Sequence, residues 1–518
     1  MRTSILLFIT AVLVLLSSCR SDFEFTSTSG GLRFSRDTVY LDTVFANVGS
    51  STYTLKVYNN SDKNISIPTI QLGRGESSGY RITVDGMTGT NNREFHNVEM
   101  LARDSLFIFI ETTASAAQAN PDDFLYTDQI QFGETGNFQA VELVTLIQDA
   151  VFLFPNRDSD GTVENILLGL DANGNEIRED GFLLDASELH FTNEKPYVIY
   201  GFAAVPSGRT LNIDQGARVH FHYGSALVGF GGSNININGA PSLNQANLEN
   251  EVIFEGDRLE PEFSDLSGQW LGIYMLSGSK GNFNNLTIKN GTIGIFAGGF
   301  NSSVNYSLNL NNIQIYNSAY AGILAQTAHV RGKNIVINTS GYVSMECSIG
   351  GKYNFTHCTF NNSLASSNHF ALIVSDNAGS VSDVLEEATF NNCIAYGSNA
   401  TEVLLSSQDP LGSLVYKFDH CLLKINPFSS AVTNNLAYRL SDPQYFDSCL
   451  IAEDNSTFRP FFWNVAQNKL NITPESAAVQ QADPILSNES PNDILDVLRP
   501  TASPADIGAY QAAPAPEN

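Results

Sequence analysis

Seven short segments in the second half of the chain share one pattern, and this repeat limits the fold more strongly than any other feature. Each segment starts with Asn, His or Ser and continues with apolar side chains, as in Asn285-Leu286-Thr287-Ile288 and His420-Cys421-Leu422-Leu423. Successive segments begin 27, 22, 23, 35, 28 and 28 residues apart, at Asn285, Asn312, Asn334, His357, Asn392, His420 and Ser448. Units of this size without a helical pattern cannot enclose a core alone, so they must stack on one another.

The repeat therefore predicts a solenoid of stacked strands, which we expect between residues 197 and 465. Neighbouring rungs would lie about 4.8 Å apart, the spacing of hydrogen-bonded strands. The unequal steps between segments then correspond to loop insertions, and the longest insertion falls between Phe360 and Asn391.

Two motifs extend this interpretation to a known architecture. The stretch Gln269-Trp270-Leu271-Gly272-Ile273 and the ending Ser503-Pro504-Ala505-Asp506-Ile507-Gly508-Ala509-Tyr510 resemble motifs of Bacteroidota β-helix proteins. Together with the repeat, they resemble the right-handed parallel β-helix of the pectate-lyase-like superfamily. The resemblance implies the fold only, because that superfamily contains lyases, hydrolases, epimerases and binding proteins.

The first residue of each repeat is the candidate ligand contact. If these residues alternate with the buried ones, they face outward, where a β-helix would bind a sugar chain. The candidate binding residues are Asn312, Asn334, His357, Asn392 and His420. The alternative is a structural ladder, in which stacked amide groups hydrogen-bond to each other along the rod.

Four cysteines occupy one equivalent position in consecutive repeats, at Cys358, Cys393, Cys421 and Cys449. Stacked side chains point the same way, which suits a disulfide poorly, so we predict a buried column of free thiols. The histidines that precede two of these cysteines would face the opposite side. We therefore predict no metal site on the repeat.

The amino terminus indicates export and lipid anchoring. Residues 1–18 combine Arg2 with an uncharged apolar run and small residues, which is typical of a signal peptide, and the run is too short to span a bilayer. Leu16-Ser17-Ser18-Cys19 resembles the lipobox of bacterial lipoproteins, which implies that Cys19 carries the lipid. The alternative is an ordinary signal peptide. We expect residues 19–31 to be a tether to the bacterial outer membrane, with the protein exposed on the cell surface.

The rest of the chain also favours β-structure. Short alternating strands between residues 32 and 151 predict a sandwich that resembles immunoglobulin-like domains, and residues 152–196 predict connecting hairpins. Residues 466–518 are expected to pack on or cap the helix and to end in a disordered tail. The fold class is thus all-β, with an immunoglobulin-like β-sandwich followed by a right-handed parallel β-helix.

Asp171 to Glu176 is similar to a calcium loop, but Asn173-Gly174 favours a hairpin turn, so we predict no cofactor.

The charged residues of the chain limit its possible partners and its possible chemistry. The chain carries 54 acidic and 27 basic residues, a net charge of −27, which excludes nucleic acid as a favoured partner. No carboxylate pair of the kind that hydrolases use stands on the repeats, and no catalytic residue is identified. The bases on the coils are few: Lys280, Lys289, Arg331, Lys333 and Lys352. We therefore expect a non-catalytic surface protein that binds a polysaccharide or an outer-membrane protein. The alternative is a polysaccharide lyase or glycoside hydrolase.

Overall fold

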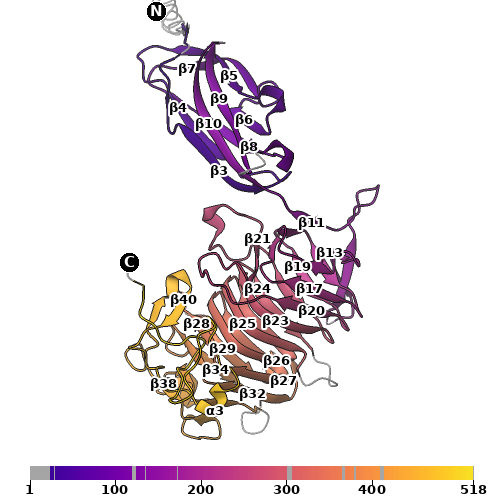
Figure 1. The fold of residues 1–518 in the computed structure, drawn as a ribbon, viewed down its shortest axis with the longest axis vertical. Helices are drawn as coiled ribbons and strands as arrows, with labels where there is room; N and C mark the ends of the chain where they lie inside the picture. Colours follow the sequence, from indigo (N-terminus) through magenta and orange to yellow (C-terminus); the bar gives the residue numbers. More distant parts are fainter. Residues whose placement is uncertain are drawn as a thin grey trace, which may run out of the picture. The chain divides into compact units, whose positions relative to one another are not determined.

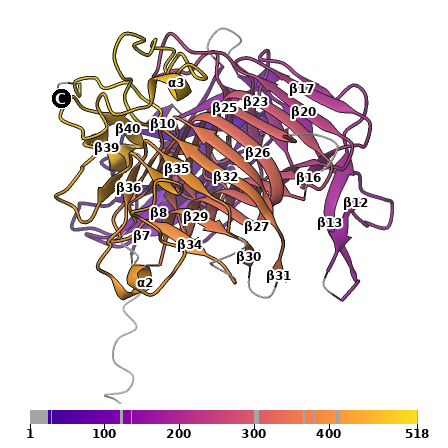
Figure 2. The same cartoon turned by 90° about the horizontal axis from the view of Figure 1, so that it is seen from below.

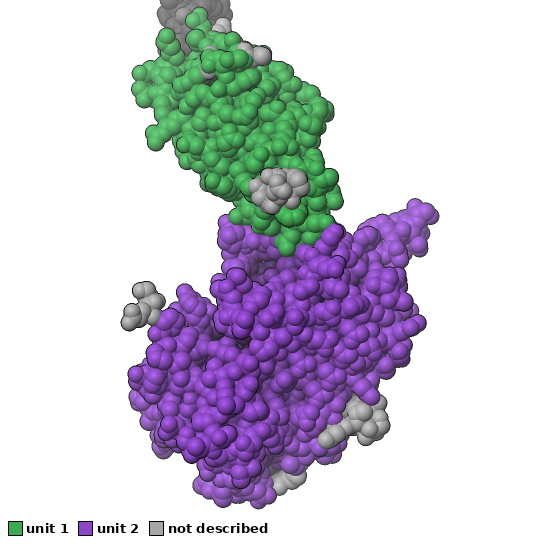
Figure 3. All heavy atoms as spheres, in the orientation of Figure 1, with its two compact units in different colours: residues 1–149 green, residues 150–518 purple. Residues whose placement is uncertain are grey.

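The computed structural model describes residues 24–28, 30–119, 124–134, 136–171, 173–299, 306–364, 368–378, 381–408 and 414–516. The predicted signal peptide and Cys19 lie outside the described residues. The chain divides into two compact units, residues 1–149 and residues 150–518 (Figure 3). Within the described residues no helix has the length and apolar character needed to span a bilayer.

Unit 1 is a sandwich of two sheets around one core (Figure 1). The first sheet has the order β1 (Thr26–Ser27), β5 (Ile65–Leu72), β9 (Leu125–Glu134), β10 (Asn137–Gln148) and β3 (Thr38–Phe45), and β7 (Glu94–Met100) pairs with β5. The second sheet has the order β2 (Arg33–Phe34), β4 (Tyr53–Tyr58), β8 (Ser105–Thr112) and β6 (Tyr80–Val84). Short 3₁₀ turns lie at Gly75–Ser77 and Ala116–Gln118.

The period of two in the sequence explains how this core forms. In β8, Leu106, Ile108 and Ile110 are buried, whereas Phe107 and Phe109 remain partly exposed. Successive side chains of a strand point to opposite faces, so one face of each sheet enters the shared core. Inside it the rings of Tyr80 and Tyr126 stack with centroids 5.1 Å apart.

Unit 2 is a parallel β-helix whose coils contribute strands to three faces. We call the face that carries asparagine columns the amide sheet. It contains β14 (His190–Phe191), β17 (Thr210–Asp214), β20 (Asn234–Asn238), parts of β23 (Lys280–Lys289), β25 (Leu308–Ser318), β26 (Ala321–Ser340) and β27 (Val343–Thr356), then β32 (Leu385–Asn391), β35 (Lys417–Asp419) and β37 (Phe446–Asp447). Figure 2 shows strands of successive coils side by side, such as β23, β25, β26 and β32.

The second face is called the covered sheet, because later residues pack over it. It contains β11 (Val151–Leu153), β15 (Tyr197–Ile199), β18 (Arg218–Phe221), β21 (Val252–Gly256), the ends of β23, β25 and β26, then β28 (Thr359–Asn362), β33 (Ile394–Gly397), β36 (Leu422–Lys424) and β38 (Leu450–Ala452).

The third face, the apolar sheet, begins at a hairpin of β12 (Asn165–Leu170) and β13 (Glu176–Leu183). It continues through β16 (Phe202–Val205), β19 (Ala226–Gly229), β22 (Gly272–Met275), β24 (Ile293–Gly298), the starts of β26 and β27, β29 (Phe370–Ser375) and β34 (Val403–Ser406). Two further short strands, β30 (Asn377–Ala378) and β31 (Val381–Ser382), pair with each other.

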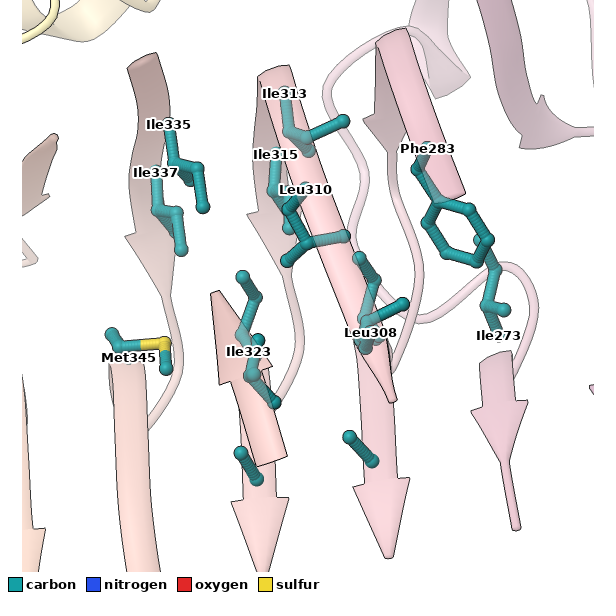
Figure 4. Packing of buried hydrophobic residues seen from close by; sticks show 14 of the residues in the cluster. Ile273, Phe283, Leu308, Leu310, Ile313, Ile315, Ile323, Ile335, Ile337 and Met345 are labelled. Atoms are coloured by element: carbon teal, nitrogen blue, oxygen red, sulfur yellow. The ribbon is translucent and has the colours of Figure 1, made fainter. Parts of the chain in front are cut away.

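Equivalent side chains from successive coils stack inside the helix. Ile313 and Ile315 pair in register with Ile335 and Ile337, and all four are fully buried (Figure 4). Farther along, the rings of Phe355, Phe390, Phe418 and Phe446 form a column with centroid separations of 5.5, 5.1 and 5.2 Å. The prediction of an all-β chain with a sandwich followed by a parallel β-helix is confirmed.

The last part of the chain folds back over the covered sheet. It contains β39 (Phe462–Asn464), a 3₁₀ turn (Val465–Gln467), β40 (Lys469–Ile472) and the short helix α3 (Pro484–Ser487). We call residues 462–513 the C-terminal segment. Its Ile472, Ala505 and Ile507 pack against Ile394 and Leu422 on the outer surface of the covered sheet. Two other short helical turns lie at Pro261–Phe263 and, as α2, at Ser430–Thr433.

Candidate functional site

The residues that begin each repeat are turn residues between the amide sheet and the covered sheet. Asn285, Asn312, Asn334, His357, Asn392, His420 and Ser448 all have φ between 47° and 55°. This left-handed conformation is unfavourable for most side chains and is best tolerated by Asn among non-glycine residues. The alternation of a strand stops at these positions, so they are not the regular outward-facing strand residues that the repeat predicts.

Hydrogen bonds join several of these turns into a ladder. The amide of Asn312 donates to Asn285 Oδ1 at 3.2 Å, and that of Asn334 donates to Asn312 Oδ1 at 2.9 Å. Farther along, Asn392 Nδ2 lies 3.1 Å from His357 Nε2. These hydrogen bonds are the ones expected of a structural ladder, the alternative to a ligand site at these residues.

Three of the five candidate ligand contacts are covered by the C-terminal segment. Asn334 is 3% exposed, and His357 and Asn392 are fully buried. Asn334 donates to Asn492 O at 2.9 Å, His357 Nε2 lies 3.0 Å from Ser487 Oγ, and Asn392 Oδ1 accepts the Asp483 N–H at 2.8 Å. A ligand could not reach these side chains in this structure. Only Asn312 and His420 of the candidates remain partly exposed.

Burial also favours the uncharged form of the His357 ring. Desolvation holds the pKa of His357 well below its ordinary value, and the nearby Arg499 guanidinium acts in the same direction. The neutral ring can both donate and accept, which matches its contacts with Ser487 Oγ and the carbonyl of Gly508. His357 is therefore part of the packing between the C-terminal segment and the turns.

The cysteines form the predicted buried column. Cys358, Cys393 and Cys421 are buried and free, and Cys449 is partly buried and free. The backbone N–H of Cys358 donates to Cys393 Sγ, and that of Cys393 donates to Cys421 Sγ, both at 3.4 Å. Burial raises the pKa of the Cys393 and Cys421 thiols well above the ordinary value, so these thiols are not reactive.

A second set of asparagines lies on the exposed surface of the amide sheet, at positions that the first residues of the repeats do not predict. Asn236 donates to Asn212 Oδ1 at 3.0 Å, Asn282 to Asn236 at 3.3 Å, and Asn309 to Asn282 at 3.1 Å. A neighbouring column contains Asn284 and Asn311, joined at 3.4 Å. The signal was present in the sequence as the alternation Asn234-Ile235-Asn236-Ile237-Asn238.

These columns end at a groove of about 470 Å³, the candidate site. One wall is the amide sheet and its turns, and the other is residues 489–496 of the C-terminal segment. The lining side chains are mostly polar: Asn284, Asn309, Asn311, Asn312, Asn334, Arg331, Lys333, Glu489, Ser490, Asn492, Asp493 and Asp496, with Leu310 and Pro491.

Two cations, Arg331 and Lys333, face this groove from one strand, β26. Arg331 extends the first amide column by donating to Asn309 Oδ1 at 3.2 Å, and its guanidinium lies 5.4 Å from the ring centre of Tyr306. Lys333 Nζ contacts the carbonyl oxygen of Glu489. Burial lowers the pKa of Lys333, and Arg331 adds to this effect. In the described part of the chain neither cation forms an ion pair with a carboxylate.

One group in the described residues has the composition of a metal site. Ligand atoms of Asp419, His420 and Asp483 lie within 4.8 Å of one another. However, Asp419 already pairs with His420 Nδ1 and with Lys417 Nζ, both at 2.7 Å, and Asp483 Oδ1 accepts two backbone N–H groups of α3. Protein groups therefore already satisfy this cluster, and we assign no ion to it. Asp171 likewise accepts the N–H groups of Asn173 and Asn175 inside the hairpin turn.

Comparisons with known proteins add little. No family model matches the chain, and no curated protein matches it. Among solved structures, the chain is similar to the E. coli chaperone DraB over 24% of this chain and 57% of that chain, with 15% identity and a TM-score of 0.16. The periplasmic chaperone SfaE gives 15% identity, 23% and 57% coverage and a TM-score of 0.14.

A family 123 glycoside hydrolase from Clostridium perfringens is also similar, with 9% identity over 23% of this chain and 26% of that chain and a TM-score of 0.16. The chain spans a little over half the length of the two chaperones and about a quarter of the hydrolase. At these TM-scores the likenesses carry no argument about function.

Proposed function

We propose that this protein is exported, anchored to the bacterial outer membrane through a lipid on Cys19, and binds a carbohydrate in the groove of the amide sheet without catalysis. The observation that supports binding is the regular array of asparagine amides that leads into the groove. The proposed anchor depends on the lipobox-like sequence Leu16-Ser17-Ser18-Cys19.

The chemistry of the array suits hydroxyl groups. An asparagine amide has two N–H donors and one oxygen with two lone pairs. Within a column an amide donates one N–H to its neighbour, and Asn236 Oδ1 accepts from both Asn234 and Asn282. Polar groups that are left over would recur at a spacing of about 4.8 Å, which fits a ligand with hydroxyl groups along its length.

The charge of the groove favours a glycan with few anionic groups. Arg331 and Lys333 share the groove with the exposed carboxylates of Glu489 and Asp496 and with the buried Asp493, so both signs of charge are present there. This local balance contrasts with the net charge of −27 of the chain. Tyr306, next to Arg331, offers an aromatic ring beside these polar groups. A protein partner would be expected to meet a larger apolar surface than this groove offers.

The test is glycan binding by the full chain, followed by calorimetry on the best ligand. Arg331→Ala and Asn309→Ala should each weaken binding about tenfold, the loss expected for one hydrogen-bonding group in a binding site. Asn247→Ala, an exposed asparagine outside the groove, is the matched control and should not change the affinity. Equal affinity for the wild type and both groove variants would contradict the proposal.

A second candidate function, a polysaccharide lyase, is favoured by one observation. Lys333 is a partly buried amine whose pKa is lowered by burial, and an amine that loses its proton can serve as a base. Incubation with a panel of polysaccharides should show whether unsaturated sugar ends are released. Release by the wild type that is lost in Lys333→Met would replace the non-catalytic proposal with this one.

A further inference from the structure

A buried lysine lies against an asparagine side chain near the end of the β-helix. Lys424 is the last residue of β36 and is 1% exposed, which is rare for a lysine. Its Nζ donates to the carbonyl oxygen of Gly397 at 2.7 Å and contacts Asn455 Oδ1. The ring of Tyr396 lies 4.9 Å from the same Nζ.

Asn455 is held over this amine by its own loop. The loop follows β38, and the carboxylate of Asp454 accepts the N–H groups of Ser456 and Thr457 at 2.7 and 3.0 Å. Asn455 is itself exposed, so its amide lies between the buried amine and solvent.

A buried carboxyl group, that of Glu402, completes the arrangement. Glu402 is fully buried directly before β34, and its backbone N–H donates to the carbonyl oxygen of Lys424 at 2.9 Å. Its Oε1 accepts the Asn399 N–H at 2.6 Å, whereas its Oε2 has no hydrogen-bond partner among the described residues. An unpaired buried polar atom is costly and calls for an explanation.

The environment favours the uncharged forms of both groups. Burial lowers the pKa of Lys424, against the attraction of Glu402 and Asp454. Burial also raises the pKa of Glu402 to about 8, so its carboxyl group is protonated at neutral pH. A neutral amine is a nucleophile, and a protonated carboxyl group that interacts electrostatically with it can supply a proton.

We propose that Lys424 and Asn455 become joined by an intramolecular isopeptide bond. The lone pair of Lys424 Nζ attacks Cγ of Asn455, an N–C bond forms, and the bond from Cγ to the side-chain nitrogen breaks. The protonated carboxyl group of Glu402 delivers its proton to the departing nitrogen, which leaves as ammonia, and then takes up the proton that the attacking nitrogen loses. No oxidant or metal is required, and the carboxyl group is restored.

The position of the bond gives it a structural role. Lys424 lies on β36, and Asn455 follows β38, the next strand along the covered sheet. In the described residues, β38 is the last strand of this sheet, so no further coil holds it in place. A covalent link between the two would prevent this end of the solenoid from opening, because repeats are stabilised mainly by their neighbours.

Peptide mapping by mass spectrometry of the purified full-length chain tests the bond. We expect a branched tryptic peptide that contains both Lys424 and Asn455, with a mass one ammonia below the sum of its two parts. Trypsin should not cleave after Lys424. Lys424→Arg and Asn455→Ala should each abolish the branched peptide. Recovery of both linear peptides from the wild type, with cleavage after Lys424, would overturn the proposal.

Two further variants show whether the bond depends on the acid group of Glu402 or only on correct folding. Glu402→Gln keeps the size of the side chain and removes its acid group, so its chain should remain unlinked while showing the far-ultraviolet circular dichroism of the wild type. Lys417→Arg, on β35 of the same coil, is the matched control and should retain the branched peptide. Full linkage in Glu402→Gln would contradict the role assigned to that carboxyl group.

Discussion

Asparagine serves two different purposes in this chain, and backbone conformation separates them. At the turns, Asn285, Asn312 and Asn334 adopt positive φ and hydrogen-bond to each other. On the amide sheet, Asn309 and Asn311 have extended backbones and present their amides to the groove. The first group supports the coil, and the second group is available for a ligand.

Substitution of Asn312 should separate its conformational role from its hydrogen bonds. Asn312→Ala loses both, and we expect a loss of about 2 kcal/mol in the free energy of unfolding. Asn312→Gly keeps the left-handed conformation accessible, so it should lose about half as much. Asn311→Ala, one residue earlier on the exposed strand, should change stability by less than about 0.5 kcal/mol. Thermal unfolding followed by circular dichroism measures all three, and equal losses for Ala and Gly at position 312 would contradict this account.

The buried His357 should make stability depend on pH. Because its folded-state pKa is depressed, the unfolded chain binds a proton at His357 that the folded chain does not, once the pH falls below about 6.5. The free energy of unfolding should therefore decrease on acidification from about pH 7.5 to about pH 5.5, by at most about 1.4 kcal/mol per pH unit for this group.

The buried His220 acts in the same direction, so the comparison with a variant isolates His357. In His357→Gln the slope of stability against pH should be smaller than in the wild type. Denaturant unfolding at several pH values provides the slopes, and identical slopes would show that His357 does not contribute.

At the scale of elements, the sequence predicted the rungs but not where each strand ends. The repeat placed strands at Asn392-Cys393-Ile394 and similar segments, whereas β33 begins at Ile394, after the turn at Asn392. Periodicity marks which residues are buried, and it does not distinguish a strand residue from a left-handed turn residue. The restriction to Asn, His and Ser at one position was the signal for the turn.

Glycine in the Trp270-Leu271-Gly272-Ile273 motif has a steric role that the motif alone does not explain. Gly272 has a φ of 137°, and a Cβ there would lie 1.9 Å from the carbonyl oxygen of Ile293 on the next coil. Gly272→Ala should therefore lower the free energy of unfolding by about 3 kcal/mol or prevent folding. Gly169→Ala is the control and should be tolerated, because among the described residues beyond its chain neighbours no atom lies within 4 Å of the added carbon.

At the scale of the whole molecule, sequence reasoning identified both compact units and missed the groove. Arg331 and Lys333 were recognised as rare cations, but nothing local indicated that residues 489–496 would face them. That placement results from packing between parts of the chain more than 150 residues apart, such as the hydrogen bond from Asn334 to Asn492. Burial of His357 and Asn392 has the same origin, so the repeat alone predicts them as ligand contacts and does not predict their burial.

Removal of the C-terminal segment should expose an apolar surface and abolish the groove. A chain that ends at residue 461 would uncover Val336, Ile394 and Leu422, which the segment now covers. We expect binding of a hydrophobic dye, association into larger species and loss of glycan binding. Light scattering and dye fluorescence measure the first two effects. A monomeric truncated chain that binds the glycan normally would contradict the place assigned to the site.

The groove can form only after the β-helix has been synthesised, because residues 489–496 make up its second wall. Residues 489–496 are synthesised after the described strands of the β-helix, and Arg499 holds them by donating to the carbonyl oxygens of Ser490 and Asn492 and to Asn334 Oδ1. Stacked coils can form progressively as the chain emerges, whereas the proposed binding groove is completed only when residues 489–496 have arrived. Ligand binding would thus require that synthesis has passed residues 489–496, and a chain cut before them would lack one wall of the groove.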